Sequence, residues 1–420
     1  MRTRSQVFTV VSVALIVGLL ATTFAASAQG ARSVRGFDGS TVTIAGLGIA
    51  SQFMPDSETG TNARINRFNA TSELKGVKIK LAEMADSGFT DPGTALSEGR
   101  RLVTQDQVFA IVPMLSQTVP GDYLARQHVP FFGWGFDKAY CSPAVSTKVW
   151  GFSWDGCVIP PDAKRTGDLG IGMYKYVSEK TGKKHPTIAL YSTDTAGGKL
   201  AVQGSASTYA GEGWNVVYAT AEVPDPVTDM TPYVQRWITS DNGHAPDAIG
   251  CLGSTACITN YGQVKAAGFT GEYLGAPYFG ALAKILEGAV VLSGSVPLET
   301  TGVPALEQMK QDFTAVKPGS SPSAISQVAY FSADFFIQAL KKVAKQYGVK
   351  GITPERVQQV ASTMTWEIKG LAGPVKYPAS TYIQTPTCAA VVVSDGTKFN
   401  TVEPFACSYK TYPMLDKYKS

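Results

Sequence analysis

The stretch from Leu74 to Asp137 constrains the fold most, because strand and helix patterns alternate within it at short spacing. Apolar and polar residues alternate over 77–82, which indicates a half-buried strand. Asp91-Pro92-Gly93 is typical of a helix start, and the apolar run 109–112 suits a strand that is covered on both faces. A second short helix over 119–126 and a third strand over 129–132 follow. The stretch therefore predicts a β-α-β-α-β unit.

Such a unit folds into a parallel sheet with helices on both faces, because crossovers between parallel strands are right-handed. Ligands of these sheets bind beyond the carboxyl ends of the strands. Two segments follow strand ends in this stretch, Ser116-Gln117-Thr118 and Trp134-Gly135-Phe136-Asp137. We therefore expect an α/β fold and take these two segments as the first candidates for a binding site.

The same stretch carries an ordered series of motifs. They are a G-x-x-I/V-x-L strand, an acidic turn before a helix, a helix ending near V-x-x-D, a strand running into a Ser/Thr loop, and a V-P-x-I/F strand: Gly76–Leu81, Asp86–Pro92, Leu102–Asp106, Phe109–Thr118 and Val129–Phe132. This order resembles the first lobe of type I periplasmic solute-binding proteins, in the Leu/Ile/Val-binding branch of ABC importers. The resemblance covers most of residues 38–412, and its specificity lies in the order of the motifs.

The resemblance implies two similar doubly wound parallel-sheet lobes, joined by a three-stranded hinge, with a ligand cleft between them. Lobe one is expected to comprise 38–160 and 297–365, and lobe two 161–296 and 366–412. Among the expected elements are a first helix over Thr61–Thr71, a helix over Asp168–Lys180, and a last strand over Cys388–Val393 before a polar tail.

The N-terminus has the pattern of a targeting segment. Arg2 and Arg4 precede an apolar run over Val7–Leu20, and Ala26-Ser27-Ala28 is typical of a cleavage site. The run is shorter than the roughly 20 residues that a membrane span needs. We therefore expect a signal peptide over 1–28 and a mature protein in the periplasm or at the cell surface, with an uncleaved anchor as the alternative. No cysteine lies near residue 28, so we expect no lipid attachment.

Length and charge limit the classes of partner. A chain of 420 residues suits two domains of ordinary size. The charged fraction is 17%, the net charge is +4, and the basic residues are scattered along the chain. Because nucleic-acid-binding domains concentrate their basic residues in patches, we expect no nucleic acid partner.

All six cysteines lie beyond the predicted signal peptide, and an even number in an exported chain indicates disulfides. The count alone leaves the pairing open. We favour the sequence-local pairing, because each pair then clips one loop or hairpin: Cys141–Cys157, Cys251–Cys257 and Cys388–Cys407. A metal site needs clustered ligands, and His128, His185 and His244 have no suitable neighbours in sequence. We expect neither a metal nor a cofactor.

Loops after the strands of lobe one are the candidate walls of the cleft. Ser51-Gln52-Phe53 follows the first strand, and the resemblance implies that this loop borders the ligand. Ser116-Gln117-Thr118 offers hydroxyl and N–H groups to a carboxylate, although a helix cap by Ser116 or Thr118 is the alternative. Trp134-Gly135-Phe136-Asp137 comes next, and Trp134 either lines the site or packs between the lobes.

Lobe two is expected to add residues after three further strands: Thr193, Asp194 and Ala196; Ser254 and Thr255; Pro277 and Tyr278, with Phe279 beside them. The resembled family usually has an aromatic residue where Ala196 stands. Its members that bind α-amino acids place an acidic residue near the turn where Ala276-Pro277-Tyr278-Phe279 stands. A buried ammonium without a partner is costly. The sequence therefore favours a ligand with a carboxylate or similar polar end and an aromatic or apolar body, with Asp137 and Asp194 as alternative partners for an ammonium.

Signals of catalysis are weak. Gly48–Gln52 does not match the G-x-S-x-G nucleophile pattern, and the three histidines are isolated in sequence, so we expect no enzyme. The expected function is an extracytoplasmic receptor, working as a monomer, that closes on a small organic ligand and delivers it to an ABC permease in the membrane. The alternatives are a ligand-sensing module with a separate signalling partner, or a true branched-chain or aromatic amino acid receptor.

Overall fold

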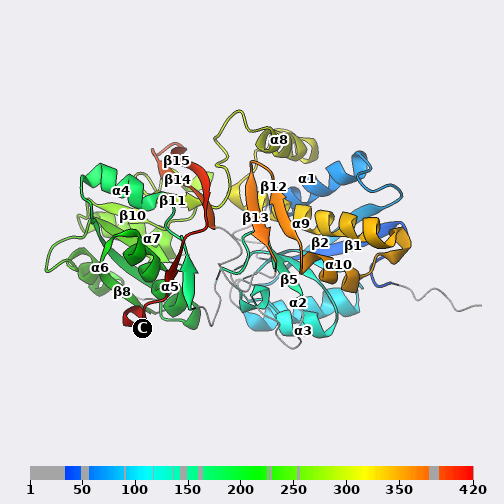
Figure 1. The fold of residues 1–420 in the computed structure, drawn as a ribbon, viewed down its shortest axis with the longest axis horizontal. Helices are drawn as coiled ribbons and strands as arrows, with labels where there is room; N and C mark the ends of the chain where they lie inside the picture. The colour runs from blue at the N-terminus through cyan, green and yellow to red at the C-terminus, as the bar shows by residue number, and fades with distance from the viewer. Residues whose placement is uncertain are drawn as a thin grey trace, which may run out of the picture. The chain divides into compact units, whose positions relative to one another are not determined.

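The computed structural model describes residues 34–48, 56–88, 91–116, 118–135, 137–141, 149–158, 164–224, 227, 229–252, 256–377 and 387–419. Residues Arg35–Ser420 form one compact unit. The predicted α/β class is confirmed, because this unit contains two larger sheets with helices packed against them (Figure 1). The predicted signal peptide over 1–28 lies outside the described residues.

The first sheet has five strands, and all its pairings are parallel, as predicted. Its order is β2 (Lys78–Asp86), β1 (Thr41–Gly48), β3 (Ala110–Leu115), β4 (Phe131–Gly133) and β5 (Gly151–Ser153). Every residue of β3 is buried, so both faces of this strand are covered. We call this sheet and the helices that pack on it or on one another beside it the first lobe: α1 (Ser57–Ala70), α2 (Pro92–Thr104), α3 (Gly121–Arg126), α8 (Pro304–Val316), α9 (Ala324–Tyr347) and α10 (Pro354–Ala361).

The second sheet has seven strands, in the order β15 (Phe399–Ser408), β14 (Thr387–Ser394), β11 (Val290–Ser293), β10 (Glu272–Leu274), β9 (Ala248–Leu252), β7 (Thr187–Thr193) and β8 (Asn215–Val223). Strands β8, β7, β9, β10 and β11 pair in parallel. Strand β14 pairs antiparallel with β11, and β15 pairs antiparallel with β14. The second lobe is this sheet with α4 (Met173–Thr181), α5 (Ala196–Glu212), α6 (Thr231–Ile238) and α7 (Ala256–Ala266). A parallel sheet alone was expected here, so the antiparallel edge is a difference.

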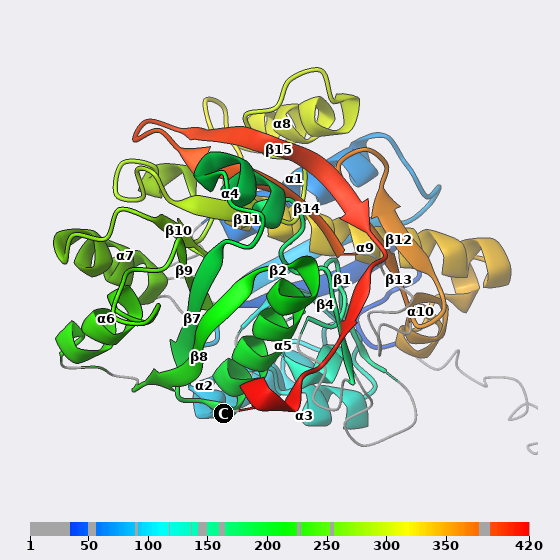
Figure 2. The same cartoon turned by 60° about the vertical axis from the view of Figure 1, so that its left-hand side comes forward.

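Strand β15 was not predicted, since the tail after Val393 was read as polar. Figure 2 shows β15 along the edge of the sheet. Most of its residues are exposed or half-buried, so the strand lacks the alternation that marks a buried face. Its ladder with β14 has two register shifts, and Pro404 lies within it, a residue tolerated on edge strands. The segment forms strand β15 because it pairs with β14, and its own residue pattern gives no strand signal.

Two helices begin at other residues than predicted. Helix α1 begins at Ser57 instead of Thr61, and its buried face includes Arg64, which hides the apolar stripe of an ordinary helix. Helix α4 begins at Met173 instead of Asp168, because Gly172 takes the left-handed conformation with φ +78. The short strand β6 (Arg165–Gly167) precedes it and pairs with β16 (Thr411–Pro413) near the C-terminus.

Side chains cap α2, as predicted, and also α10. The Asp91 carboxylate accepts a hydrogen bond from Gly93 N at 2.8 Å, with Pro92 at the first position of α2. Thr353 does the same for α10, where its hydroxyl accepts from Arg356 N at 3.3 Å.

The three predicted disulfides are all present: Cys141–Cys157, Cys251–Cys257 and Cys388–Cys407. Cys388 and Cys407 face each other across β14 and β15, so this bond closes a hairpin as expected. None of the helices in the described part of the chain is both long enough and apolar enough to cross a membrane.

Segments near the expected hinge contact both lobes. Ser295 forms a bridge with Ala372 of β13 (Ala372–Lys376), which pairs with β12 (Thr365–Ile368). The Trp366 ring stacks on Phe335 of α9 at 5.6 Å. The exact lobe boundaries at 160/161, 296/297 and 365/366 stay predictions.

Candidate functional site

The strand ends of the first sheet place three loops side by side. Met114 of β3 pairs with Gly133 of β4, and Gly133 pairs with Ser153 of β5. The loops that follow these residues therefore leave the same edge of the sheet. This edge is the carboxyl end, where ligands of parallel sheets bind.

Ser116 and Thr118 lie in the first of these loops. The Ser116 hydroxyl donates to the Thr118 carbonyl at 3.0 Å and accepts from Thr118 N at 3.3 Å, so it closes a local turn. The N-cap of α3 is Pro120, with no side-chain cap, so the alternative that Ser116 or Thr118 caps this helix is wrong. Among the described residues, Thr118 Oγ1 is buried without a hydrogen-bond partner. A buried hydroxyl in this position calls for an outside partner.

Trp134 lies in the second loop and is half-buried. It packs against a small apolar cluster formed by Leu115 at the end of β3 with Ile325 and Ala329 of α9. Phe279, from the segment after β10 of the second lobe, packs against the same cluster. Strand-end segments of both lobes therefore meet at one apolar surface, and the sequence had marked both residues.

Asp137 supports the loops with its carboxylate. Its Oδ1 accepts from Ala139 N at 2.7 Å, and its Oδ2 accepts from Val119 N at 3.4 Å. Burial raises the pKa of Asp137, partly offset by these two hydrogen bonds. Both oxygens are occupied by main-chain donors that join the loops after β3 and β4.

Asp155 is a carboxylate in the third loop that the sequence reasoning missed. It lies after β5, beyond Trp154, and is half-buried. Its Oδ1 accepts from Gly135 N at 2.9 Å and from the Ser153 hydroxyl. Burial raises the pKa of Asp155 to about 6, although Ser153 and Gly135 act against the rise. Its place close to a strand end, between Trp154 and Cys157, is the signal that could have found it.

The residues predicted from the second lobe are spread out. Thr193 ends β7 and is half-buried, whereas Asp194 is exposed and pairs with Lys199 at 3.0 Å. Pro277 is half-buried. The Tyr278 ring contacts Phe399 at 5.3 Å, and its hydroxyl donates to Glu299 and accepts from Leu298 N at 2.8 Å. Tyr278 therefore ties its turn to the segment at 298–299, and a contact with ligand stays a prediction.

Part of the predicted site cannot be placed. The following candidates lie outside the described residues: Ser51, Gln52, Phe53, Gln117, Phe136, Ser254 and Thr255. Ala196 is the first residue of α5. The described residues include no group of three or more His, Cys, Asp or Glu side chains placed to hold a metal ion.

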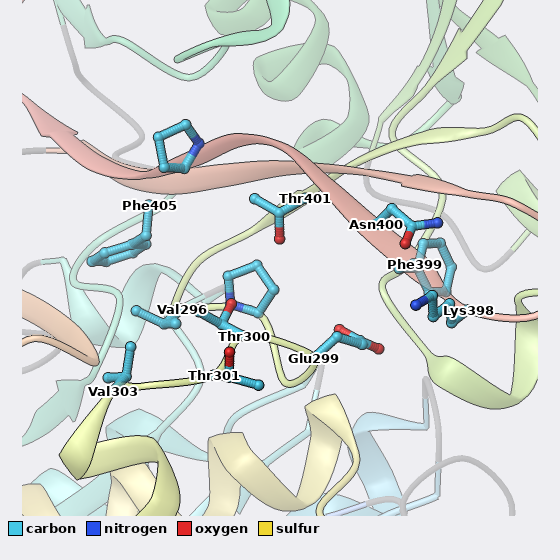
Figure 3. A pocket seen from close by; sticks show the side chains of 12 residues that line it. Val296, Glu299, Thr300, Thr301, Val303, Lys398, Phe399, Asn400, Thr401 and Phe405 are labelled. Carbon is cyan, nitrogen blue, oxygen red and sulfur yellow. The ribbon is translucent and has the colours of Figure 1, made fainter.

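A groove of about 520 Å³ lies elsewhere, between the segment 296–303 and strand β15. Figure 3 shows the side chains along it: Val296, Pro297, Glu299, Thr300, Thr301, Val303, Lys398, Phe399, Asn400, Thr401, Pro404 and Phe405. The Glu299 and Lys398 side chains lie at the same end. None of the described residues predicted for the ligand site lines this groove, so it is distinct from the strand-end loops.

Comparison with known proteins decides the family. A family model for periplasmic binding proteins matches residues 41–398. The chain belongs to the periplasmic binding protein family. No curated protein gives a significant match to the sequence.

Solved structures of substrate-binding and solute-binding proteins share its fold at low identity. The substrate-binding protein of a branched-chain amino acid transporter from Streptococcus pneumoniae, in complex with isoleucine, is 18% identical with a TM-score of 0.60, covering 87% of this chain and 100% of its own. An R. palustris solute-binding protein in complex with 4-hydroxybenzoate is 16% identical, with a TM-score of 0.64 and coverage of 90% and 98%. A Leu-, Ile-, Val-, Thr- and Ala-binding protein from Brucella ovis is 17% identical, with a TM-score of 0.66 and coverage of 89% and 95%.

Proposed function

We propose that this periplasmic binding protein is an extracytoplasmic receptor that closes on a small organic ligand and delivers it to an ABC permease. The observation that carries the proposal is the shared apolar cluster, where Trp134 of the first lobe and Phe279 of the second pack on Leu115 and α9. A ligand bound at a surface lined from both lobes contacts both lobes at once. Its binding therefore stabilises the conformation in which the lobes are closed over it. The protein acts as a monomer after removal of residues 1–28, and it catalyses no reaction.

The proposed ligand carries a carboxylate or similar polar end on an apolar or aromatic body. Trp134 and Phe279 supply apolar surface for the body. The buried Thr118 Oγ1, which lacks a partner among the described residues, supplies a donor for the polar end. Isoleucine and 4-hydroxybenzoate, bound to two of the structural neighbours, are both acids with an apolar part.

A thermal-shift screen of the mature protein, beginning at Gln29, tests this proposal. The screen contains branched-chain and aromatic amino acids, aromatic acids, short amides and steroid-type acids. We expect at least one acid with an apolar body to raise the melting temperature, because a ligand that binds only the folded state stabilises it. A panel in which no acid shifts the transition would contradict the proposed ligand class.

Replacing Trp134 with alanine tests the place of the site. We expect the variant to bind the ligand found in the screen about tenfold more weakly, because a large aromatic contact is lost. Isothermal titration calorimetry measures the affinity, and thermal unfolding without ligand measures the stability. Tyr409→Ala is the control, since Tyr409 is an aromatic residue that is 68% exposed and outside the predicted site. An unchanged affinity of the Trp134→Ala variant would show that Trp134 does not contact the ligand.

A further inference from the structure

Lysine side chains gather on one face of α9, toward its C-terminal end. Lys341, Lys342 and Lys345 lie three, four and seven residues after Gln338, so these side chains share one side of the helix. They border a groove of about 630 Å³, which we call the α9 groove. None of the described residues predicted for ligand binding lines it, so the α9 groove is separate from the strand-end loops.

The carboxylates of the α9 groove already have cationic partners. Glu73 accepts from Arg64 through both oxygens, at 2.7 and 3.1 Å, and from Lys341 at 2.8 Å. Asp334 accepts from Arg64 Nε at 2.7 Å through one oxygen and from the Trp366 indole at 3.1 Å through the other. Arg64 and Lys341 therefore balance the negative charges of these two carboxylates.

The remaining lysines of the α9 groove have no such partner. Lys342 and Lys345 are exposed, and neither forms an ion pair or a side-chain hydrogen bond within the described part of the chain. Lys75 and Lys350 each directly follow a residue that lines the groove, and they too are exposed and unpaired among the described residues. The α9 groove therefore carries positive charge that its own carboxylates do not balance.

An exposed aromatic ring stands beside these lysines in the chain. Tyr347 is the last residue of α9 and is 41% exposed, one of four large apolar or aromatic side chains exposed among the described residues. The Arg356 guanidinium lies 4.5 Å from the centroid of its ring. Basic side chains around an exposed tyrosine are typical of surfaces that rest on a bilayer, because phosphates attract the cations and the ring suits the membrane interface.

The expected strength of binding favours a bilayer over a small soluble anion. A single anion gains little from an exposed ammonium, because water screens the pair. An anionic bilayer presents many phosphates at once, and each lysine near it strengthens binding about fivefold, so four lysines together contribute about 600-fold.

We infer that the α9 groove, with its lysines and Tyr347, docks this protein on a membrane surface that carries anionic phospholipids. This interaction goes beyond the proposed function, and it would hold the receptor at the membrane of its permease. The competing explanation is that these lysines are solvated and only stabilise the C-terminal end of α9, where the helix dipole is negative.

Pelleting with vesicles tests the inference on the mature protein, beginning at Gln29. One set of vesicles is phosphatidylcholine alone, and the other is an equal mixture of phosphatidylcholine and phosphatidylglycerol. We expect the wild-type protein to partition about a hundredfold or more strongly onto the anionic vesicles at low salt. The preference should fall steeply as salt is added, because the Debye length shortens.

A double variant, Lys342→Gln with Lys345→Gln, tests the place of the docking surface. We expect it to bind anionic vesicles about 25-fold more weakly, because two lysines are lost. The matched control is Lys265→Gln with Lys284→Gln, which removes the same net charge from exposed lysines of the second lobe that are unpaired among the described residues. The control should change binding less than about twofold, since salt screens charges far from the bilayer.

Further measurements separate docking from folding and from ligand binding. The conservative variant Lys342→Arg with Lys345→Arg keeps both charges and should bind the anionic vesicles like the wild type. The glutamine variant should keep the wild-type melting temperature, because both side chains are exposed. It should also keep the wild-type affinity for the ligand found in the thermal-shift screen, so a failure of docking leaves the proposed receptor function intact.

Three results would overturn the inference. Equal binding to neutral and anionic vesicles would show that the protein does not recognise anionic lipid. Equal losses in the two glutamine variants, or no loss in Lys342→Gln with Lys345→Gln, would show that the α9 groove is not the docking surface. Displacement from the vesicles by soluble glycerol phosphate, at the same phosphate concentration, would show that the groove holds a small anion instead of a bilayer.

Discussion

Two buried sites, one in each lobe, accommodate acidic side chains in opposite ways. In the first lobe, Arg64 lies between two carboxylates, with its Nε 2.7 Å from Asp334 and its Nη1 2.7 Å from Glu73. In the second lobe, both carboxylate oxygens of Glu212 are buried without a hydrogen-bond partner among the described residues, and Asp168 lies beside it. The buried charges of the first site are balanced by ion pairs, whereas the Glu212 carboxyl group is kept neutral by a bound proton.

The pKa values record this contrast. Burial alone would raise the pKa of Glu73, but hydrogen bonds from Arg64 and Lys341 lower it from 4.5 to about 2. Burial, and then the neighbouring Asp168, raise the pKa of Glu212 from 4.5 to about 10. Burial of a carboxyl group therefore does not fix its charge, because the partner that is buried with it decides.

The contributions of these two carboxyl groups to stability consequently respond to pH in opposite directions. The contribution of Glu73 is complete above about pH 4.5 and is lost as the pH falls toward 2, because the folded state releases this proton more readily. The contribution of Glu212 is complete below about pH 4.5 and is lost as the pH rises toward 10, because the folded state holds its proton more tightly.

The largest effect is expected from breaking the charge network of the first lobe. Arg64→Leu should lower the free energy of unfolding by about 3–5 kcal/mol, because Asp334 and Glu73 lose a buried partner. Urea unfolding at pH 7 measures the change. The control is Arg101→Leu, whose partly exposed arginine pairs with Glu83, Glu98 and Asp106 and should lose no more than about 1 kcal/mol. Equal losses in the two variants would mean that burial does not strengthen the network.

A smaller effect of opposite sign is expected in the second lobe. Glu212→Gln should raise the free energy of unfolding at pH 7 by about 3 kcal/mol, because each pH unit above 4.5 destabilises the buried acid by about 1.4 kcal/mol. The same variant should flatten the dependence of stability on pH between about 5 and 10. Urea unfolding across this range measures both. A destabilised variant with an unchanged pH profile would show that Glu212 is ionised in the folded protein.

The smallest effect is expected at an exposed pair. Glu355 lies 3.4 Å from His128, and both side chains are more than half exposed. Glu355→Gln should change the free energy of unfolding by less than about 0.5 kcal/mol, because exposed pairs gain little in water. This variant is the exposed reference for Arg64→Leu and Glu212→Gln. A change in its free energy of unfolding above about 1 kcal/mol would weaken the distinction between buried and exposed charges.

Local patterns predicted the regular elements well where residues repeat with a clear period. The parallel strands β1 to β4 follow from such signals, and Asp91-Pro92-Gly93 marked the start of α2. The predicted pairing of all six cysteines was confirmed, because each pair closes a short segment. Strand β15 was missed, because an edge strand with mostly exposed residues has no such period.

The candidate site was predicted less completely than the fold. The positions after β3 and β4 were found because strand ends are visible in sequence, and Thr118, Trp134 and Phe279 lie where strand-end contacts were expected. Asp155 was overlooked, since a single aspartate in a loop has no pattern until its neighbours are known. The ligand contact of Tyr278 stays a prediction. The sequence did not show that its hydroxyl bonds to Glu299 and to Leu298 N, because no local spacing reveals contacts across about 20 residues.

By itself, the sequence determined the alternation of strands and helices, the parallel order at the centre of both sheets, the short-range disulfides and the family. These properties depend on neighbouring residues and on the order of motifs. Only the tertiary structure decided which carboxyl groups are charged. Arg64, Glu73 and Asp334 come together from α1, the loop after it and α9. The half-buried Asp155 and the buried carboxylate of Glu212 have no cation beside them among the described residues. A pKa depends on the groups that surround a carboxylate in space, and folding brings those groups from distant parts of the chain.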